Sequence, residues 1–236
     1  MSSRLKALSF AAVLCLVCSI LLTAASTGLQ SYQQKNIALD KQKNILQSVG
    51  LADSEKSYDP GTIEKLYYEN IKPFWVDSAG RIVPQGEHSD TDLPLYLYLV
   101  DNVISAYIMP INTRGLWGKI HGYLAVEADG ETISGFTVYK HSETPGLGGE
   151  IERRWFQKNF KGKKIVNRAG GFVAVGVAKG FVQDEIPSEE QINYVDGISG
   201  ATFTGKYLAS GLHDILLNYE PISIKFRKNQ MKGVGY

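Results

Sequence analysis

An uncharged apolar run near the N-terminus constrains this chain more than any other feature. No residue from position 7 to position 29 is charged, and Leu, Ala, Val, Ile and Cys predominate there. A helix needs about 20 such residues to cross the hydrocarbon core of a bilayer. Arg4 and Lys6 precede the run. By the positive-inside rule, residues 1–6 form a cytoplasmic tail, residues 7–29 form one transmembrane helix and the rest of the chain lies outside.

A cleaved signal peptide is the alternative interpretation of the same run. We favour a retained anchor, because the run is longer than a usual signal core. Residues 30–47 also follow it with high helix propensity and few helix breakers, which predicts a helical stalk or linker over residues 30–58. Cys15 and Cys18 are the only cysteines and lie inside the run, so we interpret them as packing residues. The rest of the chain therefore has no disulfide framework and no cysteine-ligated metal.

Residues 59–236 have the pattern of one α+β domain, an antiparallel sheet of five to seven strands with helices packed against it. Residues 93–111 predict one long strand or a hairpin over Asp101-Asn102. Asp129-Gly130, between two strand-like runs, predicts a second hairpin. The remaining predictions are a short helix over residues 62–74 ended by Pro73, a strand over 171–181, an amphipathic helix over 205–218, and a basic tail or docking strand over 225–236.

Charge and motif content exclude several function classes. The formal net charge is only +1, and no basic stretch alternates with aromatic residues, so nothing points to nucleic acid. The four histidines are scattered without metal-ligand spacing, so we expect no metal site. No dinucleotide-binding or phosphate-loop glycine motif is present, so NADH is expected to bind elsewhere. The uncharged membrane run also offers no sodium path through this chain alone.

The segment DGISGAT, residues 196–202, is a glycine-rich loop that leads into the predicted C-terminal helix. Free backbone N–H groups and the positive end of a helix favour a phosphate at such a place. Thr202 offers a hydroxyl there. The alternative is an ordinary N-cap preceded by a loop. The other candidate residues of this motif are Asp196, Gly197, Ser199, Gly200 and Ala201.

A second glycine cluster, HSETPGLGGE, covers residues 141–150. Gly146 and Gly148 leave room for a flat ligand, and Leu147 could supply apolar surface. Glu143 and Thr144 could supply hydrogen bonds at the ligand's edge. The alternative is a plain surface loop after a strand.

Together the two segments, E-T-P-G-L-G and then D-G-x-S-G-A-T, resemble the FMN-binding domain family. That family includes the C subunit of the sodium-pumping NADH:quinone reductase and the G subunit of the Rnf complex. The resemblance implies FMN bound covalently to Thr202 through a phosphoester, delivered from FAD by a flavin transferase, with Asp196 orienting the loop or serving the transferase. Residues 115–130 resemble the G-L-W-x-x-x-x-G-Y-L-A pattern of the quinone-reductase subunit. Leu116 and Trp117 would then lie near the flavin, the alternative being core packing.

The resemblance also implies a role and partners. The chain would carry electrons in a bacterial inner-membrane complex with subunits A, B, D, E and F. There NADH is oxidised on F, an iron–sulfur centre feeds this FMN, a second covalent FMN on B receives the electron, ubiquinone is the final acceptor and sodium ions are exported. The alternatives are the Rnf G subunit, a stand-alone membrane-anchored redox or sensor module that binds FMN, and a structural subunit without flavin.

Overall fold

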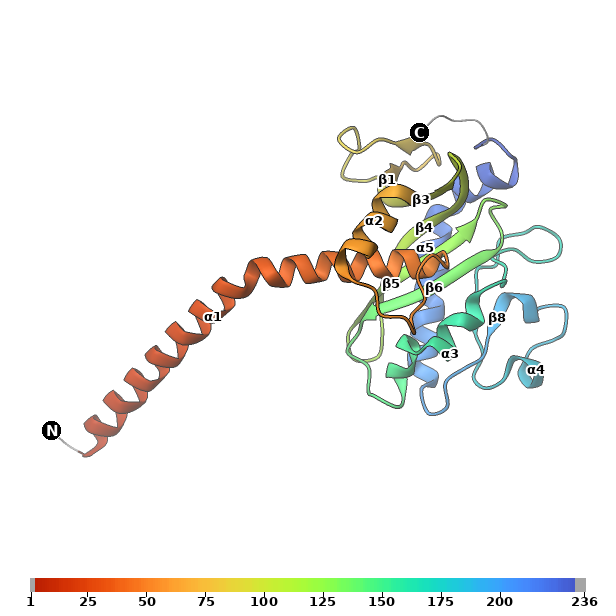
Figure 1. Cartoon of the computed structure of the whole chain (residues 1–236). Coiled ribbons are helices and arrows are strands. Elements are labelled where there is room, and N and C mark those ends of the chain that lie inside the picture. Colours follow the sequence, from red (N-terminus) through yellow and green to blue (C-terminus); the bar gives the residue numbers. More distant parts are fainter. Residues whose placement is uncertain (1–2, 232–236) are drawn as a thin grey trace. The chain divides into compact units, whose positions relative to one another are not determined.

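The computed structural model describes residues 3–231, which divide between two compact units at Asp40 and Lys41 (Figure 1). The first unit is part of a single helix, α1 (Ser3–Ser48), whose side chains are exposed along the apolar run. By length and composition this helix could cross a membrane, as a signal sequence near an N-terminus also could. It continues unbroken from the apolar run through the polar residues that follow, and it fits a single-pass membrane anchor.

The second unit is built on a six-stranded antiparallel sheet. The spatial order is β2-β1-β3-β4-β5-β6, so the four long strands β3 to β6 form a meander in chain order. The predicted α+β class with an antiparallel sheet is therefore confirmed. The strands are β1 (Ile71–Val76), β2 (Ile82–Val83), β3 (Leu93–Val100), β4 (Val103–Arg114), β5 (Lys119–Glu127) and β6 (Ile133–Lys140).

Both hairpin turns form where the sequence indicated them. Asp101 and Asn102 have φ of 51° and 61°, so residues 93–111 fold as a hairpin and not as one long strand. Two consecutive positive φ values are typical of the tight turn whose twist matches that of its strands. At the second hairpin, Asp129 Oδ1 accepts hydrogen bonds from the N–H groups of Glu131 and Thr132, and Gly130 has φ of 72°.

One face of the sheet is covered by α5 (Thr202–Arg227). Its buried residues follow helical spacing, and they form the main core with inward side chains of β3, β4 and β5. The helix begins three residues before the predicted 205–218 and extends nine residues past it. It continues through Pro221 because Ile222 and Phe226 beyond that residue are also buried against the sheet.

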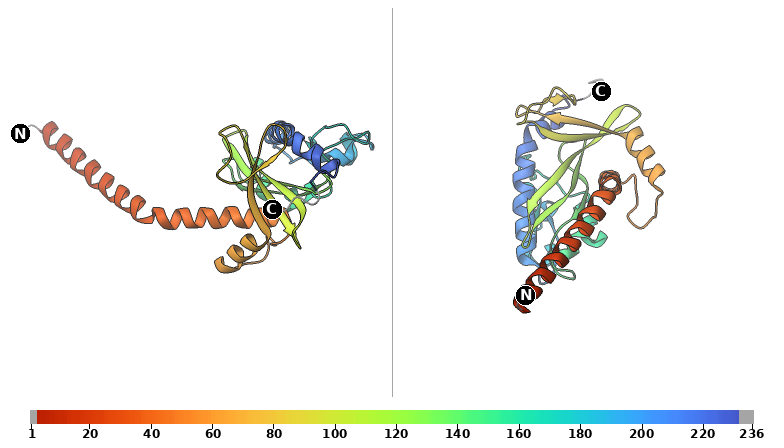
Figure 2. Two further views of the ribbon diagram at one scale, coloured as in Figure 1. Left: turned by 90° about the horizontal axis from the view of Figure 1, so that it is seen from above. Right: turned by 90° about the vertical axis from the view of Figure 1, so that its left-hand side faces the viewer.

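The last turns of α1 and α2 (Pro60–Asn70) cover the opposite face; the right-hand view of Figure 2 has α2 and α5 on opposite sides of the sheet. Ile45 and Leu46 of α1 are buried, and Thr137 Oγ1 of β6 donates a hydrogen bond to the Asn44 carbonyl at 3.3 Å. The short remaining helices are η1 (Gly148–Glu152), α3 (Arg154–Gln157), η2 (Lys158–Phe160), α4 (Val182–Glu185) and η3 (Gln191–Asn193).

Two element predictions were wrong. The helix predicted to run to residue 74 ends at Asn70, and Pro73 lies inside β1, where the chain pairs with β3 along its full length. Sheet pairing outweighed helical periodicity there. Residues 171–181 form only β7 (Gly176–Val177), which pairs in parallel with β8 (Tyr194–Val195). The N–H groups of Val173 and Ala174 both point to the Ile165 carbonyl, and this bulge interrupts a regular strand.

The predicted basic tail or docking strand takes a different form where it is described. Residues 225–227 complete α5, and residues 228–231 form a turn. Its last five residues, like the first two residues of the predicted cytoplasmic tail, lie outside the described part of the chain.

Candidate functional site

The two glycine-rich loops meet at the N-terminus of α5. A Cβ on Gly200 would stand 2.9 Å from Leu147 Cδ2, so these two residues are in contact. The Thr204 hydroxyl donates a hydrogen bond to Glu143 Oε2 at 2.5 Å. Residues far apart in the sequence thus form one surface around the start of the helix.

Thr202 is the first residue of α5 and is exposed. Ala201 at the N-cap provides no side-chain hydrogen bond, and the first backbone N–H groups of a helix have no partner within it. In the described part of the chain, the Thr202 hydroxyl makes no hydrogen bond. Gly200, with φ of 73°, turns the chain into the helix. An exposed hydroxyl therefore lies beside free donors at the positive helix end, where a phosphate is favoured.

Asp196 and Gly197 hold the loop before the helix. Asp196 Oδ1 accepts a hydrogen bond from the Val182 N–H at 2.7 Å, and the Gly197 N–H donates to the Gly180 carbonyl at 2.7 Å. A Cβ on Gly197 would lie 2.3 Å from the Ala178 carbonyl oxygen, so only glycine fits there. Asp196 is thus engaged in packing the loop, whereas Ser199 is exposed and Ala201 is buried.

Glu143 is only 5% exposed and both carboxylate oxygens have protein donors. Oε1 accepts from the Trp117 N–H at 3.0 Å, and Oε2 accepts from Thr204. A Cβ on Gly115 would approach Oε1 to 2.5 Å, and one on Gly148 would approach Oε2 to 2.7 Å. From the sequence this carboxylate was expected at a ligand's edge, but it lies inside the protein.

Two further residues complete this cluster and were not predicted from the sequence. Thr204 is buried, and nothing in its spacing distinguishes it from Thr202. His141 was interpreted as a surface residue. Its Nδ1 accepts from the Glu143 N–H at 3.1 Å, and its Nε2 lies 3.1 Å from Glu152 Oε2. The Nδ1 contact fixes the proton on Nε2 when the ring is neutral.

Exposed apolar side chains lie on the segments around this helix end. Trp117 is 69% exposed and Phe203 is 62% exposed; Leu116 and Leu147 are also exposed. The Thr144 carbonyl accepts from the N–H groups of Leu147 and Gly149, and this turn presents Leu147 outward. Phe203 was not predicted as a site residue, although an aromatic residue next to Thr202 was a possible signal.

These features fit FMN. The phosphate finds a hydroxyl and free N–H groups, and the flat ring finds exposed apolar surface. Among residues 3–231, no three His, Cys, Asp or Glu side chains come together as a metal site would require.

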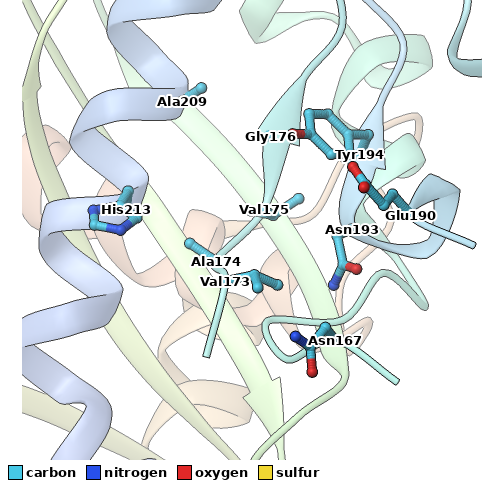
Figure 3. Close-up of a pocket in the computed structure, with 10 residues that line it drawn as sticks. All are labelled: Asn167, Val173, Ala174, Val175, Gly176, Glu190, Asn193, Tyr194, Ala209 and His213. Atoms are coloured by element: carbon cyan, nitrogen blue, oxygen red, sulfur yellow. The ribbon is translucent and has the colours of Figure 1, made fainter. Parts of the chain in front are cut away.

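A cavity of about 440 Å³ lies elsewhere on the domain (Figure 3). It is lined by Ala209 and His213 of α5, and by residues of β7, β8 and the segments around them. Figure 3 shows His213 and Asn193 on opposite walls. None of the predicted site residues lines it.

Comparison with known proteins agrees with this site. The family model of the FMN-binding domain matches residues 115–216, a range that contains every predicted site residue. The chain thus carries an FMN-binding domain. It is 35% identical to the C subunit of the Na+-translocating NADH-quinone reductase of Vibrio campbellii, with 85% of each chain covered. The C subunit from Pseudomonas aeruginosa is 30% identical, with 89% of this chain and 90% of that one covered.

Solved structures point the same way. The crystal structure of the C subunit from Parabacteroides distasonis is 33% identical, covers 83% of this chain and 96% of that chain, and superposes with a TM-score of 0.70. Shewanella oneidensis NqrC, at 22% identity and a TM-score of 0.59, shows the shared fold. The chain belongs to the NqrC family, the C subunits of Na+-translocating NADH-quinone reductases, and is thus a subunit of an oxidoreductase complex.

Proposed function

We propose that this chain carries FMN covalently, through a phosphoester to Thr202, and transfers electrons within a Na+-translocating NADH:quinone reductase. The observation that carries this proposal is the exposed Thr202 hydroxyl at the uncapped N-terminus of α5. When bound, FMN supplies the ability to accept and release electrons one at a time.

The side chains around Thr202 would then have distinct tasks. The free N–H groups of the helix end stabilise the one negative charge that a phosphodiester retains. Trp117, Leu147 and Phe203, with Leu116, present apolar surface to the ring and exclude water from its face. Asp196 and Gly197 hold the loop in the conformation that a flavin transferase must recognise.

The wider assignment follows from family membership. The partners are subunits A, B, D, E and F, the quinone is ubiquinone and the complex exports sodium ions. The apolar part of α1 anchors the chain in the bacterial inner membrane, with the N-terminus in the cytoplasm and the FMN-binding domain, residues 59–236, in the periplasm, joined by the linker over residues 30–58. Arg4 and Lys6 before the anchor support this direction.

The decisive experiment is the intact mass of the full chain purified from a host with the flavin transferase, with in-gel fluorescence under denaturing conditions. We expect the wild type to gain the mass of one FMN less one water. Thr202→Ser keeps a hydroxyl and should be modified, whereas Thr202→Ala should have the unmodified mass and no fluorescence. An unmodified wild type would refute covalent attachment. A Thr202→Ala complex with full quinone-reductase activity would instead support a purely structural subunit.

A further inference from the structure

The chain offers more than one hydroxyl near the start of α5. Ser199, Thr202 and Thr204 lie within six positions of one another, and the structure treats the two threonines differently. Thr202 is exposed, whereas Thr204 is 1% exposed and its hydroxyl donates to Glu143 Oε2 at 2.5 Å. The two side chains have the same chemistry, so their surroundings must decide which of them is modified.

Glu143 fixes Thr204 through a buried arrangement that we call the Glu143 clamp, made of Glu143, Thr204 and the backbone N–H of Trp117. Each carboxylate oxygen of Glu143 accepts one hydrogen bond, one from the start of α5 and one from the turn after β4. Gly115 and Gly148 lie too close to the carboxylate to carry side chains. A buried carboxylate with two donors is strongly held, because moving it would leave a charge without partners.

The clamp determines the direction of Thr202 through helix geometry. Successive residues in an α-helix are rotated by about 100°, so side chains two positions apart point about 200° from each other. When Thr204 is tied inward to Glu143, Thr202 must therefore point outward. Loss of the tie would allow the first turn to unwind or rotate, because the ends of helices fray readily.

We propose that Glu143 is a positioning and selectivity residue for flavin attachment, which ties Thr204 into the protein and presents Thr202 as the acceptor. This inference rests on the function proposed above. In the transfer, Thr202 Oγ forms a bond to the FMN phosphorus of FAD. The phosphoanhydride bond to AMP breaks and AMP leaves with its electron pair, while the hydroxyl proton passes to a base of the transferase or to water. Thr204 cannot react in this way while it is buried, because the phosphorus cannot reach its oxygen.

The test measures flavin transfer in vitro onto the full-length apo chain in detergent, with purified transferase and FAD, and maps the modified residue by peptide mass spectrometry. Thr204→Val removes the donated hydrogen bond at nearly constant volume, and Thr204→Ser keeps it. Thr137→Val is the matched control, since Thr137 is also a buried threonine with one hydrogen bond, but to Asn44 on the far side of the sheet. Melting midpoints identify any variant that fails to fold.

We expect Thr204→Val to lower the kcat of transfer about tenfold or more with little change in KM, because misplaced reacting groups lose rate more than binding. Thr204→Ser and Thr137→Val should react at the wild-type rate. A wild-type kcat for Thr204→Val would overturn the proposal.

A second readout does not depend on the amount of folded protein. In Glu143→Ala the hydroxyl of Thr204 is released, and part of the FMN should be found on Thr204. The double variant Thr202→Ala/Glu143→Ala should also be modified at Thr204, whereas Thr202→Ala alone should not. If Glu143→Ala carries FMN on Thr202 alone and the double variant stays unmodified, the selectivity role is refuted. If the wild type itself remains unmodified, the proposed function fails instead.

Discussion

Gly200 packs directly against Leu147, and a Cβ on Gly200 would stand only 2.9 Å from Leu147 Cδ2. Gly200 also has φ of 73°, a backbone conformation that residues with a side chain rarely adopt. The contact joins the loop before Thr202 to the glycine-rich loop that begins at His141. Its closeness therefore depends on the absence of a side chain at position 200.

Gly200→Ala should slow FMN attachment to Thr202 and reduce the free energy of unfolding by about 1 kcal/mol or more, through strain in φ and the contact with Leu147. Transfer kinetics and urea unfolding of the full chain would measure both effects. Adding Leu147→Ala removes the contact but leaves the strain, so it should restore only part of the loss. Full restoration by Leu147→Ala would show that the positive φ has no cost.

Gly122 in β5 lies against the neighbouring strand β6, at a place where the register of the pair shifts. A Cβ there would stand 1.9 Å from the Thr137 carbonyl oxygen, and backbone cannot move aside cheaply. Gly122→Ala should lower the free energy of unfolding by about 3 kcal/mol. Gly171→Ala is the control, since its Cβ would meet only the Asn167 side chain at 3.4 Å. Equal stabilities of the two variants would contradict this prediction.

Tyr107 joins the sheet to α5 through a buried hydrogen bond, with Oη donating to Ser223 Oγ at 2.7 Å. Burial raises the pKa of Tyr107, so the hydroxyl stays protonated and able to donate. Tyr107→Phe should cost about 1 kcal/mol, because Ser223 still donates to the Tyr219 carbonyl and loses only one partner. Chemical denaturation measures the change. Tyr68→Phe, on an exposed tyrosine, should have no measurable effect.

His121 should make the domain less stable as the solution becomes mildly acidic. Burial, followed by the charges of Lys140, Lys119 and Lys41, lowers the pKa of His121 below its ordinary 6.5. A histidine with a depressed folded pKa binds fewer protons in the folded state than in the unfolded state. Stability is therefore unaffected above pH 6.5 and decreases as the pH falls below it.

The check compares melting midpoints between pH 7.5 and pH 5.5 for the wild type, His121→Gln and His213→Gln, all as full chains. The midpoint of His121→Gln should fall less with decreasing pH than that of the wild type. His213 is exposed, and its substitution should leave the pH dependence unchanged. Parallel curves for the wild type and His121→Gln would rule out this contribution.

Local signals account for what could be predicted from the sequence. The run of residues 7–29 predicts its own helix, because length and apolarity are properties of a single segment. Asp101-Asn102 and Asp129-Gly130 form turns because these residues tolerate positive φ whatever surrounds them. The motif ending at Thr202 was readable for the same reason, since a glycine-rich loop at a helix start is a local arrangement.

Where the chain pairs or packs with distant segments, the sequence alone was not sufficient. Residues 71–76 became β1 because β3 was available to pair with them, and this outweighed the helical pattern that runs into them. Glu143 and Thr204 are 61 residues apart, and only the packing of α5 against the loop brings a carboxylate to a hydroxyl there. Sequence determines which groups are present, but burial and partners are set by the whole fold. The chemistry of Thr202 and Thr204 is therefore the same in the sequence and becomes different only in the tertiary structure.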